Sequence, residues 1–258
     1  MLANNDVPVR FVYSEGVGHI RLDRPEVANA INGPFIEALA AAIDKCEIDE
    51  VKTVVITGAG ERFCGGGDID SFVRSEDPSA FIGNLASSAE TQLRRLSELA
   101  KPIVAGVKGA VAGAGLAFIL NADVVIAGRS TVFTLAFSRI GLTPDSGVSY
   151  LLPRVVGLRR ALDLAVRERI LTADEALEWQ LVTEVADDAN VDSLAFDLAC
   201  DIARGNAEAI GQARRLIRSS LHATRSDHAD DEVATIAAAV LTSTAQIRLQ
   251  HFRTRSRR

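Results

Sequence analysis

Two short runs of the chain contain almost no polar positions: KTVVITGAG at 52–60 and PIVAGVKG at 102–109. A strand without alternating polar residues has both faces covered, which is typical of parallel sheets whose crossover connections are helices. Segments with helical apolar spacing lie near both runs, at 33–49 and 78–100. The chain is therefore predicted to adopt an α/β fold in which helices cover a largely parallel sheet.

Other apolar runs predict further strands and one short helix. Residues 9–25 predict a hairpin that turns at Glu15 and Gly16. Two short strands are expected within 123–136 and one within 181–186. A Gly-rich turn leads into a short apolar helix over 114–122.

From about residue 148 the pattern becomes mainly helical. The last predicted helix, 227–252, is rich in alanine and apolar for a terminal element. Such a face needs a partner, which is either the core or another subunit. We therefore expect an α/β core over 1–200 and a C-terminal helical region over 201–258.

Composition excludes several classes of protein. A net charge of −6 argues against a nucleic-acid partner, because such proteins usually carry a basic surface. Three widely separated cysteines, Cys46, Cys64 and Cys200, fit neither a disulfide framework nor a metal cluster, and favour a reducing compartment. The N-terminus lacks the pattern of a secretory signal, and the longest apolar runs are too short to span a bilayer. We expect a cytoplasmic protein that binds no membrane and no metal.

Two glycine-rich segments are candidates for ligand binding: TGAGERFCGGGDID at 57–70 and GAVAGAGLAFILNAD at 109–123. Neither fits the dinucleotide or P-loop motif well. Glycines allow peptide N–H groups to approach a ligand closely, and such groups can stabilise an oxyanion. The second segment also places N–H groups at the start of a helix, where they have no intrahelical partner. Taken singly, each could equally be a flexible turn or a site of close packing.

The order of these segments along nearly the whole chain resembles the crotonase (enoyl-CoA hydratase/isomerase) superfamily. The segments that carry the resemblance are IRLDRPEVANAIN, FCGGGDI, KPIVAGVKGAVAGAGLAF, IGLTPDSGVSYLLPRVVG and LTADEALEWQLVTEV. The resemblance implies a spiral of ββα units that carries an acyl-CoA site, with a C-terminal helical trimerisation region. It also implies a homotrimer or a dimer of trimers. No cofactor is implied, because coenzyme A is part of the substrate.

The resemblance also implies functional residues. The peptide N–H groups of Gly67 and Ala114 would form an oxyanion hole for the thioester oxygen, and Asp145 would act as the general base. Arg24 would lie near the CoA phosphates. The residues expected to bind substrate are Arg24, Cys64, Gly65, Gly66, Asp68, Glu90 and Phe137.

The chain departs from a hydratase at two positions. Hydratases of this family carry glutamates where this chain has Ala117 and Phe137, and neither side chain can activate water. Asp145 remains, as in the phenylacetate-pathway epoxide isomerases and the 3-enoyl-CoA isomerases. The related 4-chlorobenzoyl-CoA dehalogenases also have this Asp, but they use a His at the position of Glu90.

We therefore expect an isomerase that moves a double bond between 3-enoyl- and 2-enoyl-CoA, or acts on a related ring-type CoA substrate. A hydratase, a thioester hydrolase, a dehalogenase and a non-catalytic acyl-CoA binder remain as alternatives.

Overall fold

The computed structural model describes residues 7–255, so the outermost parts of the two predicted regions, 1–6 and 256–258, lie outside the description. Its main sheet has six strands in the order β1-β2-β3-β4-β6-β9. The strands are β1 (Val9–Ser14), β2 (Val17–Leu22), β3 (Thr53–Gly58), β4 (Ile103–Val107), β6 (Val124–Gly128) and β9 (Glu184–Ala186). β1 and β2 form the predicted antiparallel hairpin, and every other pairing is parallel, as predicted.

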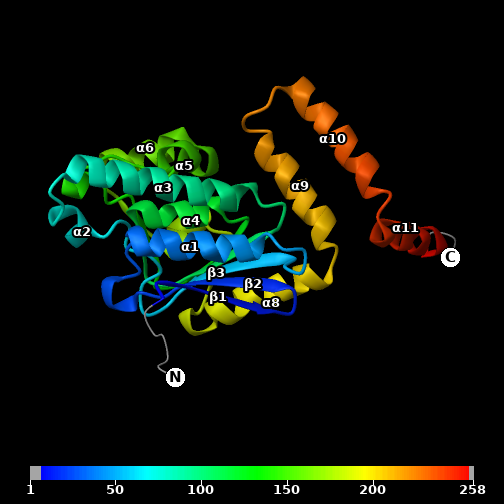
Figure 1. Cartoon of the computed structure of the whole chain (residues 1–258), viewed down its shortest axis with the longest axis horizontal. Helices are drawn as coiled ribbons and strands as arrows, with labels where there is room; N and C mark the ends of the chain where they lie inside the picture. Colours follow the sequence, from blue (N-terminus) through cyan, green and yellow to red (C-terminus); the bar gives the residue numbers. More distant parts are fainter. Residues whose placement is uncertain (1–6, 256–258) are drawn as a thin grey trace.

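Both faces of the sheet are covered. On one face, Val54 and Ile56 of β3 join the main hydrophobic core, and on the other Val55 joins a smaller cluster. Helices α1 (Gly33–Cys46), α3 (Pro78–Glu98) and α4 (Leu116–Asn121) lie on the first face, and α8 (Val191–Arg204) lies on the second (Figure 1). The alternate side chains of β3 thus serve two cores, which explains its uninterrupted apolar sequence.

The predicted boundary at residue 200 falls inside α8. This helix packs against β3 and β4, and Gly106 lets it approach closely: a Cβ there would lie 3.0 Å from the Ala195 side chain. Because α8 covers the second face of the sheet, the core continues to the end of that helix at Arg204.

A small second sheet holds the predicted site region together. It contains β5 (Ala110–Ala112), β7 (Val132–Thr134) and β8 (Ile170–Thr172), in the order β5-β7-β8. Sequence analysis anticipated β7 but missed β5 and β8. A single parallel bridge joins Cys64 to Val111, and another joins Ile31 to Gly67. The first bridge fixes the first glycine-rich segment against β5, and the second fixes it against the chain just before α1.

The first part of the mainly helical region predicted from about residue 148 forms two helices over 148–166, because Gly157 adopts φ 85° between them. The helices that complete the core are α2 (Ile69–Val73), α5 (Val148–Val156), α6 (Leu158–Val166) and α7 (Ala173–Glu178). None of the helices in residues 7–255 combines the length and apolar character needed to cross a bilayer.

The C-terminal region consists of α9 (Ala207–Ser219), α10 (Arg225–Ala239) and α11 (Ser243–Arg255). The single helix expected over 227–252 is broken between α10 and α11, where the Thr242 hydroxyl accepts the N–H of Ala245 as an N-cap does. In Figure 1, α10 and α11 extend away from the core, with α9 between α10 and the core. α10 contains no buried residue, and Val233 and Ile236 are 67% and 71% exposed.

Candidate active site

A cavity of about 210 Å³ opens between the two glycine-rich segments, α2, α3 and the loop that leads into α5. Its lining residues are mostly glycine or apolar: Gly65, Gly66, Gly67, Ile69, Phe72, Ile82, Gly83, Ala86, Gly113, Ala114, Ala136, Phe137, Ile140, Leu142, Thr143, Pro144 and Asp145. Asp145 is the single ionisable residue among them. The cavity therefore suits an uncharged acyl chain and offers it one titratable group.

The first glycine-rich segment presents the peptide N–H of Gly67. On either side of it, Gly66 O accepts the Ile31 N–H at 2.8 Å and the Asp68 N–H donates to Ile31 O at 2.9 Å. Within residues 7–255 no hydrogen bond engages the Gly67 N–H itself. A Cβ at Gly67 would lie 2.4 Å from the tip of the Phe72 ring, so a larger residue there would displace this side chain.

The second segment presents the N–H of Ala114. This residue lies in the single 3₁₀ turn Gly113–Gly115 that precedes α4, where the first N–H groups have no helical partner. Ala114 is 5% exposed and lines the cavity. Its nitrogen lies 3.4 Å from the position of a Cβ on Gly66. Gly67 and Ala114, whose N–H groups are expected to form an oxyanion hole, thus both line the same cavity.

Asp145 lines the same cavity from the turn before α5. Its carbonyl accepts the Val148 N–H at 2.9 Å, which fixes the turn, and its Oδ1 is buried without a hydrogen-bond partner in the described chain. Burial raises the pKa of Asp145 above its usual range, and the nearby Ser146 hydroxyl opposes this shift only in part. A carboxylate with a raised pKa is a stronger base than one in water.

Arg24 and Asp68 lie outside the cavity lining and support the glycine loop. The Arg24 guanidinium donates to Asp68 Oδ2 at 3.1 Å and also to the Ala30 carbonyl. Asp68 caps α2 by accepting the Ser71 N–H at 3.3 Å. Both groups are largely buried by this pairing. The expected contact of Arg24 with CoA phosphates stays a prediction.

Cys64 was expected to contact substrate, but the structure places it behind the cavity wall. It has no exposed surface, and its Sγ donates to the Asn29 carbonyl at 3.3 Å. Burial raises the pKa of the thiol to about 12, so it stays protonated at neutral pH. Its role is to pack under the loop: a Cβ on Gly115 would lie 2.6 Å from the Cys64 carbonyl.

The two positions that distinguish this chain from a hydratase differ in exposure. Phe137 forms part of the cavity wall, whereas Ala117 is fully buried within α4 and does not line the cavity. Glu90 does not line it either. However, its Oε2 lies 3.1 Å from the position of a Cβ on Gly147, two residues beyond Asp145.

The pKa of Glu90 is raised by its partial burial, lowered by Arg94 and raised again by the charge of Asp145. The two carboxylates therefore act on each other electrostatically.

Sequence analysis missed two residues that shape the site. The Asn29 side-chain amide is fully buried and donates to the carbonyls of Ala59, Arg62 and Phe63, which holds the segment before the glycine loop. Ser146 follows Asp145 and is almost fully buried. The sequence ANAIN indicated Asn29 only through the family resemblance, and no local sequence pattern indicated Ser146.

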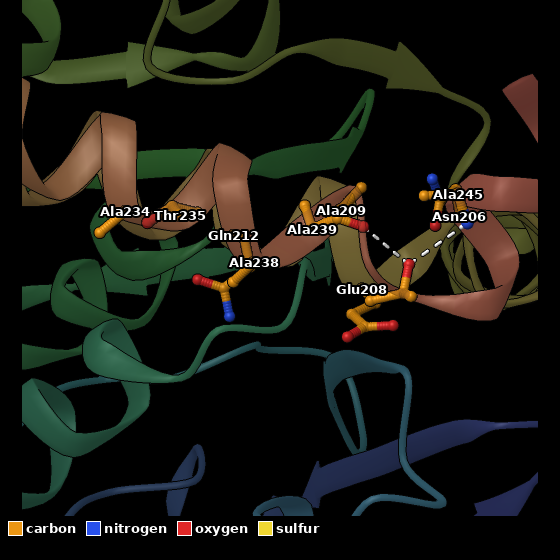
Figure 2. A pocket seen from close by; sticks show the side chains of 10 residues that line it. Asn206, Glu208, Ala209, Gln212, Ala234, Thr235, Ala238, Ala239 and Ala245 are labelled. Carbon is orange, nitrogen blue, oxygen red and sulfur yellow. Dashed lines mark hydrogen bonds between the residues drawn. The ribbon is translucent and has the colours of Figure 1, made fainter.

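A second cavity, of about 360 Å³, lies among α9, α10 and α11 (Figure 2). Its lining is rich in alanine, and Glu208 is its one ionisable residue. The paired N–H groups and the buried carboxylate belong to the first cavity, which is therefore the candidate active site.

Comparisons with known proteins identify the family of the chain. A sequence model of the enoyl-CoA hydratase/isomerase family matches residues 13–252. The chain is 37% identical over 211 residues to the 1,2-epoxyphenylacetyl-CoA isomerase of Escherichia coli (strain K12), covering 80% of each chain. It is 30% identical over 262 residues to the 4-chlorobenzoyl coenzyme A dehalogenase-1 of an Arthrobacter species, covering 100% of this chain and 95% of the relative.

The fold is also shared with solved structures. The crystal structure of an enoyl-CoA hydratase from Polaromonas sp. JS666 superposes with a TM-score of 0.89 at 26% identity, covering 96% of this chain and 97% of the other. These relatives carry names of three different activities, so the names alone do not fix the reaction. The family model, however, covers almost all of the chain, and this protein belongs to the enoyl-CoA hydratase/isomerase family.

Proposed function

We propose that this protein is an acyl-CoA isomerase that moves a double bond between the 3-enoyl and 2-enoyl positions, or acts on a related ring-type CoA substrate. The observation that supports the proposal is that Asp145 is the single ionisable residue in a cavity lining that also includes Gly67 and Ala114. One carboxylate suffices to move a proton from one carbon to another, and neither a metal nor a further cofactor is needed.

The reaction begins when the thioester oxygen binds between the N–H groups of Gly67 and Ala114. Asp145 removes a proton from C2, and the electron pair of that C–H bond moves toward the oxygen as a dienolate forms. The two donors stabilise this developing charge in a site with little water. Asp145 then returns the proton to C4, which leaves the double bond between C2 and C3 and restores the carboxylate.

The alternatives fit the cavity less well. The usual hydration mechanism uses two glutamates, and this chain has neither: Ala117 is buried and Phe137 is apolar. Displacement of an aryl halide by Asp145 would need a base to activate water afterwards, and Glu90 is the nearby candidate. Hydrolysis of the thioester requires a water site that the apolar lining does not favour.

A panel of acyl-CoA substrates tests the proposal. We expect a 3-enoyl-CoA to be converted without a change in mass, detected by chromatography and by the absorbance of the conjugated thioester. A gain equal to one water molecule on a 2-enoyl-CoA, or the release of halide or free CoA, would instead support one of the alternative reactions. Binding without any conversion would identify a non-catalytic acyl-CoA binder.

Replacing Glu90 with Gln should shift the acid limb of kcat/KM to lower pH, by less than about one unit. The negative charge of Glu90 opposes ionisation of Asp145, so its removal lowers the pKa of that base. The measurement is a pH–rate profile of wild type and variant. Glu98→Gln, an exposed change two turns further along α3, serves as the control. A limb that stays in place would show that Glu90 does not act on Asp145.

We also propose that α10 packs against other copies of this chain in a homotrimer, or in a dimer of trimers. The support is the exposed apolar stripe formed by Val233, Ile236 and Val240, spaced as one helix face. Ile236→Glu should reduce the particle from a multiple of 27.5 kDa to a single chain, measured by light scattering. Ser226→Glu adds the same charge at the start of α10 and should leave the assembly unchanged. A wild-type protein that is already monomeric would contradict the proposal.

A further inference from the structure

Ser146, the residue directly after Asp145, is unusual in both its backbone and its side chain. Its φ is 52°, in the left-handed region that residues other than glycine, asparagine and aspartate seldom adopt. It is 4% exposed, and its Oγ is buried without a hydrogen-bond partner in residues 7–255. A strained residue that buries an unpaired hydroxyl carries two costs that a glycine at this position would avoid.

The carboxyl group of Asp145, next to Ser146, also has an oxygen without a hydrogen-bond partner among the described residues. Asp145 Oδ1 is also buried and also lacks a partner within the described chain. The two residues are adjacent, and the Ser146 hydroxyl is close enough to lower the pKa of the Asp145 carboxyl against the stronger effect of burial. The two atoms are not hydrogen-bonded to each other in this structure, and no other described residue pairs with either, so rotation of the Ser146 side chain would satisfy both at once.

We propose that Ser146 is a positioning residue whose hydroxyl, once its side chain rotates, pairs with Asp145 Oδ1 and fixes the carboxylate for proton transfer. The inference rests on the proposed function in that it assigns Asp145 as the base. The left-handed turn at Ser146 serves this role, because it turns the hydroxyl inward instead of toward solvent. The strain is then the consequence of placing a polar side chain where the turn itself would favour glycine.

A hydroxyl is well suited to a base that changes its protonation state during each turnover. It can donate to Asp145 while that group is a carboxylate, and it can accept from the acid after Asp145 has taken the substrate proton. A peptide N–H could serve only the first state. With Ser146 holding one oxygen, the other oxygen of the carboxylate is directed at the substrate.

Other charged groups around Asp145 are few. Glu90 of α3 approaches the backbone of Gly147 and acts on Asp145 through its charge, and Arg94, one turn further along α3, acts on Glu90. Neither is altered by a change at Ser146. A shift in the titration of Asp145 on substitution of Ser146 is therefore due to the hydroxyl.

The test compares Ser146→Ala, which removes the hydroxyl and keeps the strained backbone, with Ser146→Gly, which removes the hydroxyl and relieves the strain. Ser149→Ala, an exposed serine three residues further on, is the control. The first measurement is the pH dependence of kcat/KM for isomerisation. The second is direct titration of the Asp145 carboxyl by ¹³C NMR, with the signal assigned from its loss in Asp145→Asn.

Loss of a donor to a carboxylate raises its pKa, so we expect the Asp145 titration and the acid limb of kcat/KM to move up by about one pH unit in both Ser146 variants. At a pH below the limb, kcat/KM then falls about tenfold. Ser149→Ala should match wild type. A large loss in Ser146→Ala that Ser146→Gly restores would overturn the proposal, since strain and not the hydroxyl would then be responsible.

An unchanged Asp145 titration in both Ser146 variants would also overturn it. The NMR titration needs no substrate. If wild type fails to isomerise any substrate but the titration still shifts, the proposed function fails and the pairing of Ser146 with Asp145 stands.

Discussion

Replacing Asp145 with Asn should lower kcat for conversion of 3-enoyl- to 2-enoyl-CoA by about 10²–10⁴-fold. The amide has nearly the same shape but cannot accept the C2 proton. The oxyanion donors are backbone groups of other loops, so they are unaffected, and KM should change little. Initial rates measured from the absorbance of the conjugated thioester provide the test. Asp197→Asn, an exposed change on α8 at the far face of the sheet, should keep full activity.

The same substitution should stabilise the protein at neutral pH. Burial raises the pKa of Asp145 in the folded chain above its value in the unfolded chain. Stability from this group therefore falls as pH rises from the unfolded pKa to the folded pKa, because the folded state holds the proton more tightly. Asparagine removes this effect.

Thermal unfolding as a function of pH should show Asp145→Asn more stable than wild type above that window, with the difference vanishing in acid. A variant that is inactive and also less stable at neutral pH would mean that the carboxylate supports the fold, and its loss of activity could then not be assigned to catalysis.

Replacing Gly115 with Ala should lower kcat by about 10²–10³-fold, the loss typical of a displaced oxyanion donor. The added Cβ would lie 2.6 Å from the Cys64 carbonyl oxygen and 2.9 Å from its Cβ, and the first of these is a backbone atom that cannot rotate away. The two glycine-rich segments must then separate, and with them the N–H groups of Gly67 and Ala114. The variant should also unfold at lower temperature than wild type.

Gly83→Ala is the matched control for this prediction. Gly83 also lines the cavity, but a Cβ there would meet no atom within 4 Å. Since Gly83 lies inside α3, alanine should raise helix stability slightly and leave the rate unchanged. If Gly115→Ala retained wild-type activity, the close contact between the two segments would not be what sets the donor positions.

The main sheet could be predicted from sequence because its central strands are long and apolar on both faces. β5 and β8 were missed because each runs directly into a helical turn, at Gly113 and at Ala173, which hides the short strand, and their pairing is decided by distant partners. The break between α10 and α11 was missed because Val240 and Leu241 continue the apolar character of the helix, while the cap at Thr242 depends on local geometry.

Only the parts of the site that carry a recognisable sequence motif could be predicted. The glycine segments and Asp145 were found from residue type, order and family resemblance, and the structure brings them to one cavity. The pairing of Arg24 with Asp68 joins residues far apart in sequence, so the support that this arginine gives the glycine loop could not be predicted. The left-handed backbone of Ser146 could not be predicted, because glycine is the residue expected in that conformation.

Because Asp145 is the single ionisable group in the cavity lining, the proposed reaction uses one residue both to remove and to return the proton. A carboxylate on one wall can reach only the face of the acyl chain that is turned toward it. In the proposed isomerisation, removal at C2 and delivery at C4 would then occur on the same face, which would make the transfer suprafacial. The apolar surroundings also slow exchange of the captured proton with solvent, so a hydrogen isotope placed at C2 would be carried in part to C4 of the same molecule.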